Sequence, residues 1–299
     1  MVRGSQHGES HGGVYTIDFA NEKVEQHIDW NTSEIDFTGR GWDRGLRGIE
    51  FHNQKIYIAA SDELFVYDKS FVLQGSYRNP YLKHCHEIWR MEHLLFLTST
   101  GYDSLLAFDL RRERFVWGLY LQRDKDGWRG QPFDPASETG PPFQNNLHLN
   151  MVYVDQTGVY VSGMHTQALL HVNGKLELHE ICTVPPGAHN VRPYRDGVLF
   201  NDTHSDCVRF VSRSGGQRVF KIPVYETEQL QFMGVDDSKV ARQGFGRGLC
   251  VIDDRLIAAG SSPSTITIYD IESGMRVASV NLTMDIRNAI HGLEVWPYR

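Results

Sequence analysis

His148-Leu-Asn-Met-Val opens an apolar, strand-like run, and five other stretches of the chain open in the same way. In chain order the six are Arg47-Gly-Ile-Glu-Phe, His86-Glu-Ile-Trp-Arg, His148-Leu-Asn-Met-Val, His189-Asn-Val-Arg-Pro, Arg247-Gly-Leu-Cys-Val and His291-Gly-Leu-Glu-Val. Four of them begin with histidine and two with arginine. If each is the same strand of a repeated unit, these six side chains converge on one axis, because equivalent positions of a closed repeat face its centre.

The starts of these stretches are separated by 39, 62, 41, 58 and 44 residues. After each start the sequence continues with a second strand such as Leu94-Leu-Phe-Leu-Thr, a small polar turn, and a third strand such as Ile266-Thr-Ile-Tyr-Asp. A fourth strand follows in most units. β-Branched and aromatic runs bounded by Gly, Asp, Asn and Ser are typical of strands and turns, and no long stretch has a helical period. Four strands in a unit of about 40 residues predict a β-propeller.

We therefore expect one all-β domain over residues 1–299, a six-bladed propeller with four strands per blade. Only nine residues run from His291 to Arg299, so the last blade needs strands from the beginning of the chain. Gly13-Val-Tyr-Thr-Ile-Asp-Phe matches a third strand and Lys23-Val-Glu-Gln-His-Ile-Asp a fourth, with the residues before Gly8 as a candidate second strand. Closing the ring in this way removes free sheet edges.

Three long spacings indicate insertions near residues 30–46, 123–147 and 226–246. Each joins the outermost strand of one blade to the innermost strand of the next. We expect all three on the top face, around the histidine and arginine positions, where long loops of a compact domain are often functional lids.

Composition excludes several classes of function. The formal net charge of −7 argues against a general binder of nucleic acid or of anionic membranes. Cys85, Cys182, Cys207 and Cys250 are far apart and form no Cys-x-x-Cys pair, so a disulfide framework is not expected. No run approaches the roughly 18 apolar residues of a membrane helix, and the first residues lack a signal-peptide core. We expect a cytoplasmic protein with neither nucleic acid nor membrane as a partner.

The repeated histidines predict a metal centre. A mononuclear first-row metal, with iron favoured and Cu, Zn, Mn or Ni as alternatives, would be bound by three or four of His86, His148, His189 and His291. Arg47 and Arg247 stay cationic and would hold a small anionic molecule. A metal in this place can polarise an oxygen or activate water. The leading hypothesis is a metal-dependent oxygenase, lyase or hydrolase acting on a small anionic substrate.

Other interpretations stay open. The first is metal-free group transfer, such as sulfuryl transfer, with one axial histidine as nucleophile or acid–base group and the arginines stabilising negative charge. A second is a non-enzymatic scaffold that binds a ligand or another protein. Mutual hydrogen bonding of the histidines, or an axial water chain, would also explain the repeat on structural grounds.

A second tier of candidates lies beside these positions. His165 and His204 align in the turns between second and third strands, Gly-Met-His-Thr and Asp-Thr-His-Ser, and could contact the substrate. Glu87, Asn150 and Asn190 lie beside the cluster and could orient the imidazoles or could equally satisfy strand ends. Glu50 and Glu294 occupy matching places in their strands and could form a carboxylate pair or support the site, or could be surface glutamates or strand-end ion pairs.

The pattern resembles several propeller families. Four axial histidines are similar to the iron ligands of carotenoid cleavage oxygenases and to the inward histidines of the nitrous-oxide reductase copper site, although both families have seven blades. His148-x-Asn150 with Arg247 and His291 resembles the six-bladed arylsulfate sulfotransferases, which are larger and exported. Trp128-Arg129, Pro141-Pro-Phe143 and His148-Leu-Asn150 resemble uncharacterised bacterial six-bladed propellers with a His-Leu-Asn motif. This last resemblance covers about one blade strongly, and it implies the fold without an activity.

Overall fold

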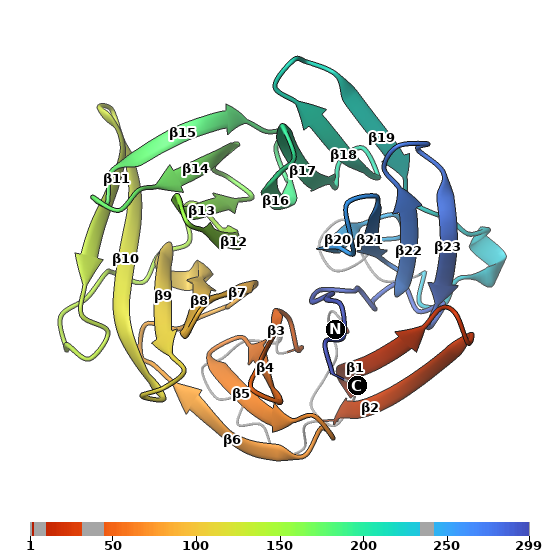
Figure 1. The fold of residues 1–299 in the computed structure, drawn as a ribbon, viewed down its shortest axis with the longest axis horizontal. Helices are drawn as coiled ribbons and strands as arrows, with labels where there is room; N and C mark the ends of the chain where they lie inside the picture. The colour runs from red at the N-terminus through yellow and green to blue at the C-terminus, as the bar shows by residue number, and fades with distance from the viewer. Residues whose placement is uncertain (1, 3–9, 32–44, 234–241, 299) are drawn as a thin grey trace.

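The protein is an all-β ring of antiparallel sheets around a central axis, a β-propeller (Figure 1). The computed structural model describes residues 2, 10–31, 45–233 and 242–298. The strands are β1 (Ser10–Asp18), β2 (Lys23–Asn31), β3 (Ile49–His52), β4 (Lys55–Ala60), β5 (Glu63–Asp68), β6 (Leu73–Arg78), β7 (Ile88–Met91), β8 (Leu94–Ser99), β9 (Ser104–Asp109), β10 (Arg114–Asp124), β11 (Gly127–Phe133), β12 (Leu149–Asp155), β13 (Gly158–Gly163), β14 (Ala168–Val172), β15 (Leu178–Thr183), β16 (His189–Tyr194), β17 (Gly197–Asp202), β18 (Cys207–Ser212), β19 (Gln217–Lys221), β20 (Gly246–Val251), β21 (Leu256–Ser261), β22 (Thr265–Asp270) and β23 (Arg276–Asn281). Two 3₁₀ turns, η1 (Thr100–Tyr102) and η2 (Thr227–Gln229), are the helical elements of the described ranges, and neither is long or apolar enough to cross a membrane.

Five sheets form complete blades: blade 1 is β3–β6, blade 2 is β7–β11, blade 3 is β12–β15, blade 4 is β16–β19 and blade 5 is β20–β23. In each blade the first strand lies near the axis and the last at the rim (Figure 1). Inner strands are covered on both faces by neighbouring blades, so all six residues of β9 are buried while β6 at a rim is largely exposed. The predicted all-β propeller is thus confirmed.

The expectation of six four-stranded blades is wrong. β1 and β2 form a separate two-stranded sheet between blade 5 and blade 1, and residues 291–298 form no strand (Figure 1). The packing of aromatic rings gives the physical reason. Trp296 and Tyr298 each place a ring centroid 5.6 Å from that of Phe51, and the Tyr298 hydroxyl donates to the carbonyl of Lys55 at 2.7 Å. These contacts hold the C-terminal segment on blade 1 instead of beside β1.

Of the described residues, β1 and β2 are the strands in the sixth position of the ring. β1 and β2 correspond to the predicted third and fourth strands, and the candidate second strand before Gly8 lies outside the described residues. A cavity of about 810 Å³ lies between β1 and residues 288–296. Val2 lies at one end of this gap, where its amide donates to the His11 carbonyl at 3.1 Å and where it bridges to Asn288.

The turns after the third strands follow from a repeated aspartate. Asp68, Asp109 and Asp270 end β5, β9 and β22, and each accepts hydrogen bonds from two backbone amides of the turn that follows. Aspartate side chains favour turns by this local bonding. The Tyr-Asp and Phe-Asp pairs in the sequence therefore mark where the chain turns back after the third strand in three of the blades.

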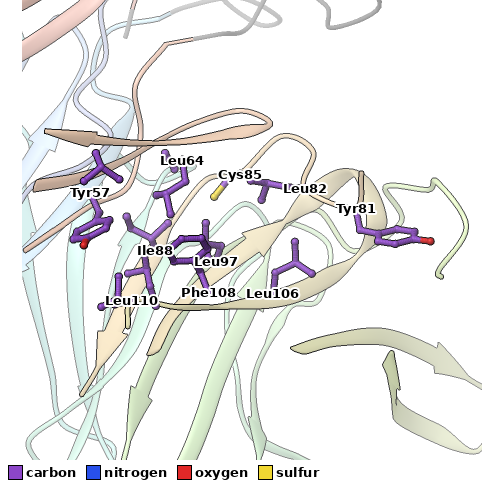
Figure 2. Close-up of a cluster of buried hydrophobic side chains, with 13 residues drawn as sticks. Tyr57, Leu64, Tyr81, Leu82, Cys85, Ile88, Leu97, Leu106, Phe108 and Leu110 are labelled. Atoms are coloured by element: carbon purple, nitrogen blue, oxygen red, sulfur yellow. The ribbon is translucent and has the colours of Figure 1, made fainter. Parts of the chain in front are cut away.

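Neighbouring blades are held together mainly by apolar side chains. Between blades 1 and 2, Tyr57 and Leu64 pack against Ile88, Leu97 and other buried residues (Figure 2). Fully burying one such side chain stabilises the fold by about 1.5–3 kcal/mol, so each of these interfaces contributes substantially to the ring.

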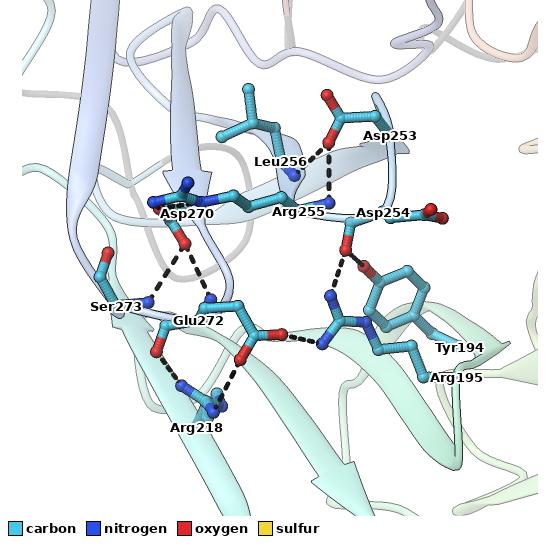
Figure 3. A network of polar contacts seen from close by, with 10 residues as sticks. All are labelled: Tyr194, Arg195, Arg218, Asp253, Asp254, Arg255, Leu256, Asp270, Glu272 and Ser273. Carbon is cyan, nitrogen blue, oxygen red and sulfur yellow. Dashed lines mark hydrogen bonds and ion pairs between the residues drawn. The ribbon is translucent and has the colours of Figure 1, made fainter.

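Polar contacts also link blades 4 and 5 at the rim. Glu272 of blade 5 pairs with Arg195 and Arg218 of blade 4, and the Tyr194 hydroxyl donates to the Asp254 carbonyl at 3.4 Å (Figure 3). The side chain of Glu272 is 51% exposed, so these ion pairs contribute little stability.

Only one of the three predicted insertions is described in full. Residues 32–44 of the first and 234–241 of the third lie outside the described residues. Residues 123–147 are only partly a loop, because β11 pairs with the extended end of β10 and gives blade 2 a fifth strand at the rim (Figure 1). The remainder packs on the turn that contains Asp103, whose carboxylate accepts from the amides of Asn146 and Leu147 at 2.8 and 3.0 Å.

Candidate functional site

Repeated irregularities in the innermost strands position the site. The pairing of first and second strands shifts register between Leu149 and Met151 in blade 3, between His189 and Arg192 in blade 4, and between Gly246 and Leu249 in blade 5. Such bulges bend a strand and turn its side chains toward a new direction. They occur at the equivalent place in three blades, beside the residues that the sequence predicted to face the axis.

Five of the six predicted residues come together. We call Arg47, His86, His148, Arg247 and His291 the axial cluster. The ring centroid of His86 lies 5.1 Å from that of His148 and 6.4 Å from that of His291. Nη1 of Arg247 lies 2.9 Å from Nε2 of His291. Arg47 is 2% exposed and acts electrostatically on all three imidazoles.

His189 occupies the equivalent position of blade 4 but packs differently. Its ring stacks edge-on against Phe245 at 5.7 Å, and its Nδ1 lies 2.8 Å from the Gly187 carbonyl. The guanidinium of Arg247 covers the same phenyl ring at 4.6 Å. Phe245 therefore contacts both the fourth predicted histidine and Arg247 of the axial cluster.

The hydrogen bonds of His86 determine which of its nitrogens carries the proton. Its Nδ1 lies 2.7 Å from the His84 carbonyl and 2.8 Å from Oγ1 of Thr100. The Thr100 hydroxyl donates its own proton to the Leu149 carbonyl, so both neighbours of Nδ1 are acceptors. Neutral His86 must carry its proton on Nδ1, which leaves the lone pair of Nε2 available.

His148 and His291 instead accept hydrogen bonds from neighbouring side chains. Nδ2 of Asn145 lies 3.1 Å from Nδ1 of His148, so this Nδ1 accepts and Nε2 carries the proton in the neutral ring. Nε2 of His291 accepts from the Arg247 guanidinium. His148 also has a backbone φ of 51°, in the left-handed region that non-glycine residues rarely occupy.

The electrostatics of the cluster favour neutral imidazoles beside positive charge. Burial, followed by Arg47 for His86 and by Arg247 for His291, lowers the pKa of both imidazoles well below the usual value. Burial and then Arg247 lower the pKa of His148 to about 3. At neutral pH the cluster thus combines three uncharged rings with two guanidinium groups.

The donor set fits an anion better than a metal cation. Within the described ranges no group of three or more His, Cys, Asp or Glu side chains has the arrangement that would hold a metal ion. One of the three clustered imidazoles already accepts a hydrogen bond from Arg247, and two guanidinium charges oppose a divalent cation. Oxyanions, in contrast, match guanidinium geometry.

The two predicted turn histidines lie outside the cluster. His165 is exposed at its edge, with a ring centroid 5.9 Å from that of His148 and Nδ1 3.0 Å from the Asn146 carbonyl. His204 is also exposed and lies against Gly187, where an added Cβ would be 2.7 Å from its Nε2.

Three of the predicted supporting residues, Glu87, Asn190 and Glu294, lie around one small cavity. Nδ2 of Asn190 donates to Glu87 at 2.9 Å, and both residues line a cavity of about 10 Å³, the size of one water, with Arg192 and Glu294. Burial raises the pKa of Glu87 to about 7 and that of Glu294 to about 8, with Arg192 acting in the opposite direction. Burial also raises the pKa of Glu50.

Asn145 and Arg192 of the site were not singled out from the sequence, and Thr100 was expected near it only as part of the polar turn from Ser99 to Asp103. Thr100 and Asn145 determine which ring nitrogen carries the proton in His86 and in His148. Arg192 is the cation that acts on the buried Glu87. Asn150 was predicted either to orient an imidazole or to satisfy a strand end, and its Nδ2 donates to the Ala188 carbonyl, next to the start of β16, at 3.3 Å. The polar turn that contains Thr100 was the signal available, since such turns lie next to the innermost strands.

Comparison with known proteins supports the fold. No protein-family model matches the chain, and no curated protein matches it. Among solved structures it is similar to a streptogramin B lyase, with 10% identity over 84% of this chain and 87% of the other and a TM-score of 0.54. It is also similar to a chain of a nidogen/laminin complex, with 7% identity over 92% and 89% and a TM-score of 0.59. Identities this low establish a shared propeller fold alone.

Proposed function

We propose that the axial cluster is the active site of an enzyme that binds a small oxyanion, a carboxylate, sulfate or phosphate, and removes a proton from it. The single observation that carries this proposal is the hydrogen bond from Arg247 to His291 inside a buried cluster that also contains Arg47. Two guanidinium groups among neutral imidazoles form a preorganised positive site, in which negative charge is stabilised far more than in water.

The hydrogen-bonded tautomers support a different role for each of two histidines. Burial and the charges of Arg47 and Arg247 lower the pKa of His86, and a bound anion offsets those charges. The lone pair on Nε2 of His86 then accepts the substrate proton and gives an imidazolium, while the electron pair of the broken bond stays on the substrate. The charges of Arg47 and Arg247 stabilise that anion. His148 donates a hydrogen bond through Nε2–H and keeps its proton, as a neutral imidazole can. No other reactant is needed for this step.

Oxyanion binding is the first test. Calorimetric titration with sulfate, phosphate and acetate should show binding that Arg47→Met and Arg247→Met each weaken at least tenfold, because each loses a charge-assisted hydrogen bond. Arg276→Met, which removes an exposed arginine from the rim strand β23, is the matched control and should bind as the unmodified protein does. Undiminished binding by Arg247→Met would overturn the proposal.

Metal analysis separates this proposal from the metal-dependent alternative. Protein purified without a chelator or a nickel column should bind oxyanions equally well after exhaustive chelation. Near-stoichiometric metal that disappears in both His86→Ala and His148→Ala, together with loss of anion binding on chelation, would favour the metal-dependent enzyme instead.

A further inference from the structure

The cavity of about 810 Å³ between β1 and residues 288–296 has mainly apolar walls. On one side it is lined by blade 5, where Ala258, Ile266 and Ile268 face it, and on the opposite side by Ile49 and Ile58 of blade 1. Its size and lining are those of a small-molecule pocket, which is usually 300–1,000 Å³ and apolar with a few polar groups.

The architecture explains why this space exists. In the rest of the ring, the inner strands of one blade are covered by the next blade. Among the described residues, β1 and β2 alone occupy the sixth position, and the faces of β21, β22 and β4 border the cavity. Apolar surface of this kind is stabilised when an apolar partner removes it from water.

The cavity is continuous with the axial cluster. Arg47 and His291, two members of that cluster, also line the cavity. Arg47 is 2% exposed, so its guanidinium is a buried charge in a mainly apolar lining, which also contains the charged side chains of Asp18, Lys23, Glu25, Lys69 and Glu294. A buried cation beside apolar walls matches a molecule with an anionic group at one end and an apolar body behind it.

We propose that the cavity binds the apolar body of an amphipathic acid, a long-chain or aryl carboxylate or sulfate, whose charged group reaches Arg47 and His291. This inference rests on the proposed function, because the anionic group occupies the axial cluster. It specifies the substrate class, which the cluster by itself leaves open among all small oxyanions.

A chain-length series tests the inference. Acetate, octanoate, dodecanoate and dodecyltrimethylammonium are titrated into the whole protein by calorimetry. Each added methylene should tighten carboxylate binding about fourfold until the cavity is filled, and the cationic amphiphile should bind at least a hundredfold more weakly than dodecanoate.

Variants locate the binding. Ala258→Leu places extra atoms in the cavity and should lower the ratio of dodecanoate to acetate affinity at least tenfold, with Ile266→Phe as a second filling variant if the first fails to fold. Ala136→Leu, at an exposed alanine, is the matched control and should leave that ratio unchanged. Arg47→Met should weaken both carboxylates.

The outcomes distinguish the two proposals. Acetate binding without any chain-length dependence would overturn the inference and leave the proposed function standing. Dodecanoate binding that neither Ala258→Leu nor Arg47→Met weakens would also overturn it. Hydrogen-exchange protection of the β1 amides by a peptide with the sequence of Leu256–Ser261, but not by dodecanoate, would assign the cavity to an added strand instead.

Discussion

His86 and His148 are the same residue type at equivalent positions of neighbouring blades, yet their hydrogen-bond partners place the proton on different ring nitrogens. The hydroxyl of Thr100 and the carbonyl of His84 accept from Nδ1 of His86, whereas the amide of Asn145 donates to Nδ1 of His148. One ring therefore offers a lone pair and the other an N–H. Two such rings with centroids 5.1 Å apart can act on opposite ends of one proton-transfer step.

Buried titratable residues along the axis give the fold two opposed responses to pH. The pKa of His148 is lowered from 6.5 to about 3, mainly by burial, so the unfolded chain binds more protons between these values and stability falls as the pH drops below 6.5. The pKa of Glu294 is raised from 4.5 to about 8 by burial. Its contribution is fully present below pH 4.5 and is lost as the pH rises through 8.

Glu294→Gln and His148→Gln should each flatten one side of the stability profile. Thermal unfolding between pH 4 and 9 at constant ionic strength should show that Glu294→Gln removes part of the loss between pH 4.5 and 8, on the order of 1 kcal/mol after solvent screening. His148→Gln should remove part of the loss below pH 6.5. An unchanged slope between pH 6.5 and 8 in the Glu294→Gln profile would contradict the buried, protonated state of this carboxyl.

At the scale of the element, a glycine places the Arg247 side chain. Gly248 lies in the bulge of β20 with a φ of 74°, and an added Cβ would lie 2.8 Å from the His291 carbonyl and 3.0 Å from Ile290. Both the backbone conformation and the close approach of the C-terminal segment therefore require glycine here.

Gly248→Ala should destabilise the protein and weaken anion binding together. The strained backbone and the contact with the His291 carbonyl should cost about 1–3 kcal/mol in urea unfolding. Because Arg247 would move relative to His291, sulfate affinity should fall as well. Gly274→Ala is the control, since this glycine also has a positive φ of 73° but its Cβ would meet no neighbouring atom; it should lose stability without losing affinity.

Elements that follow hydrophobic alternation were predictable, and elements made by tertiary pairing were not. The strands with β-branched and aromatic alternation lie where the pattern placed them, as β9 and β22 do. β11 was missed because Gly127-Trp-Arg-Gly-Gln-Pro-Phe contains two glycines and a proline, and it is a strand only through its pairing with β10. His189 was predicted to join the cluster, and the sequence offered no sign that its ring would pack against Phe245.

For the whole molecule, closure of the ring depends on aromatic contacts more than on strand pairing. The described residues of the C-terminal segment add no strand to a sheet. The Trp296 ring instead stacks on Phe71, with the ring centroids 5.4 Å apart. The ring of His27 in β2 also stacks on Phe71, with the centroids 4.1 Å apart. Blade 1, the β1–β2 sheet and the C-terminal segment therefore meet around one phenyl ring. Register and alternation in the sequence contained no information about such a junction.

Trp296→Ala should loosen the packing around Phe71 and should also weaken anion binding by the axial cluster. Trp296 is 37% exposed, so its loss should cost about 2 kcal/mol, less than the roughly 3–5 kcal/mol of a fully buried tryptophan. Hydrogen exchange should rise selectively in β1, β2 and residues 291–298, because these are the segments that the ring contacts hold. Since His291 belongs to this segment, sulfate affinity should also fall. Trp128→Ala, in the rim strand β11, is the control; equal effects of the two substitutions on exchange near His291 would show that the ring closes by some other contact.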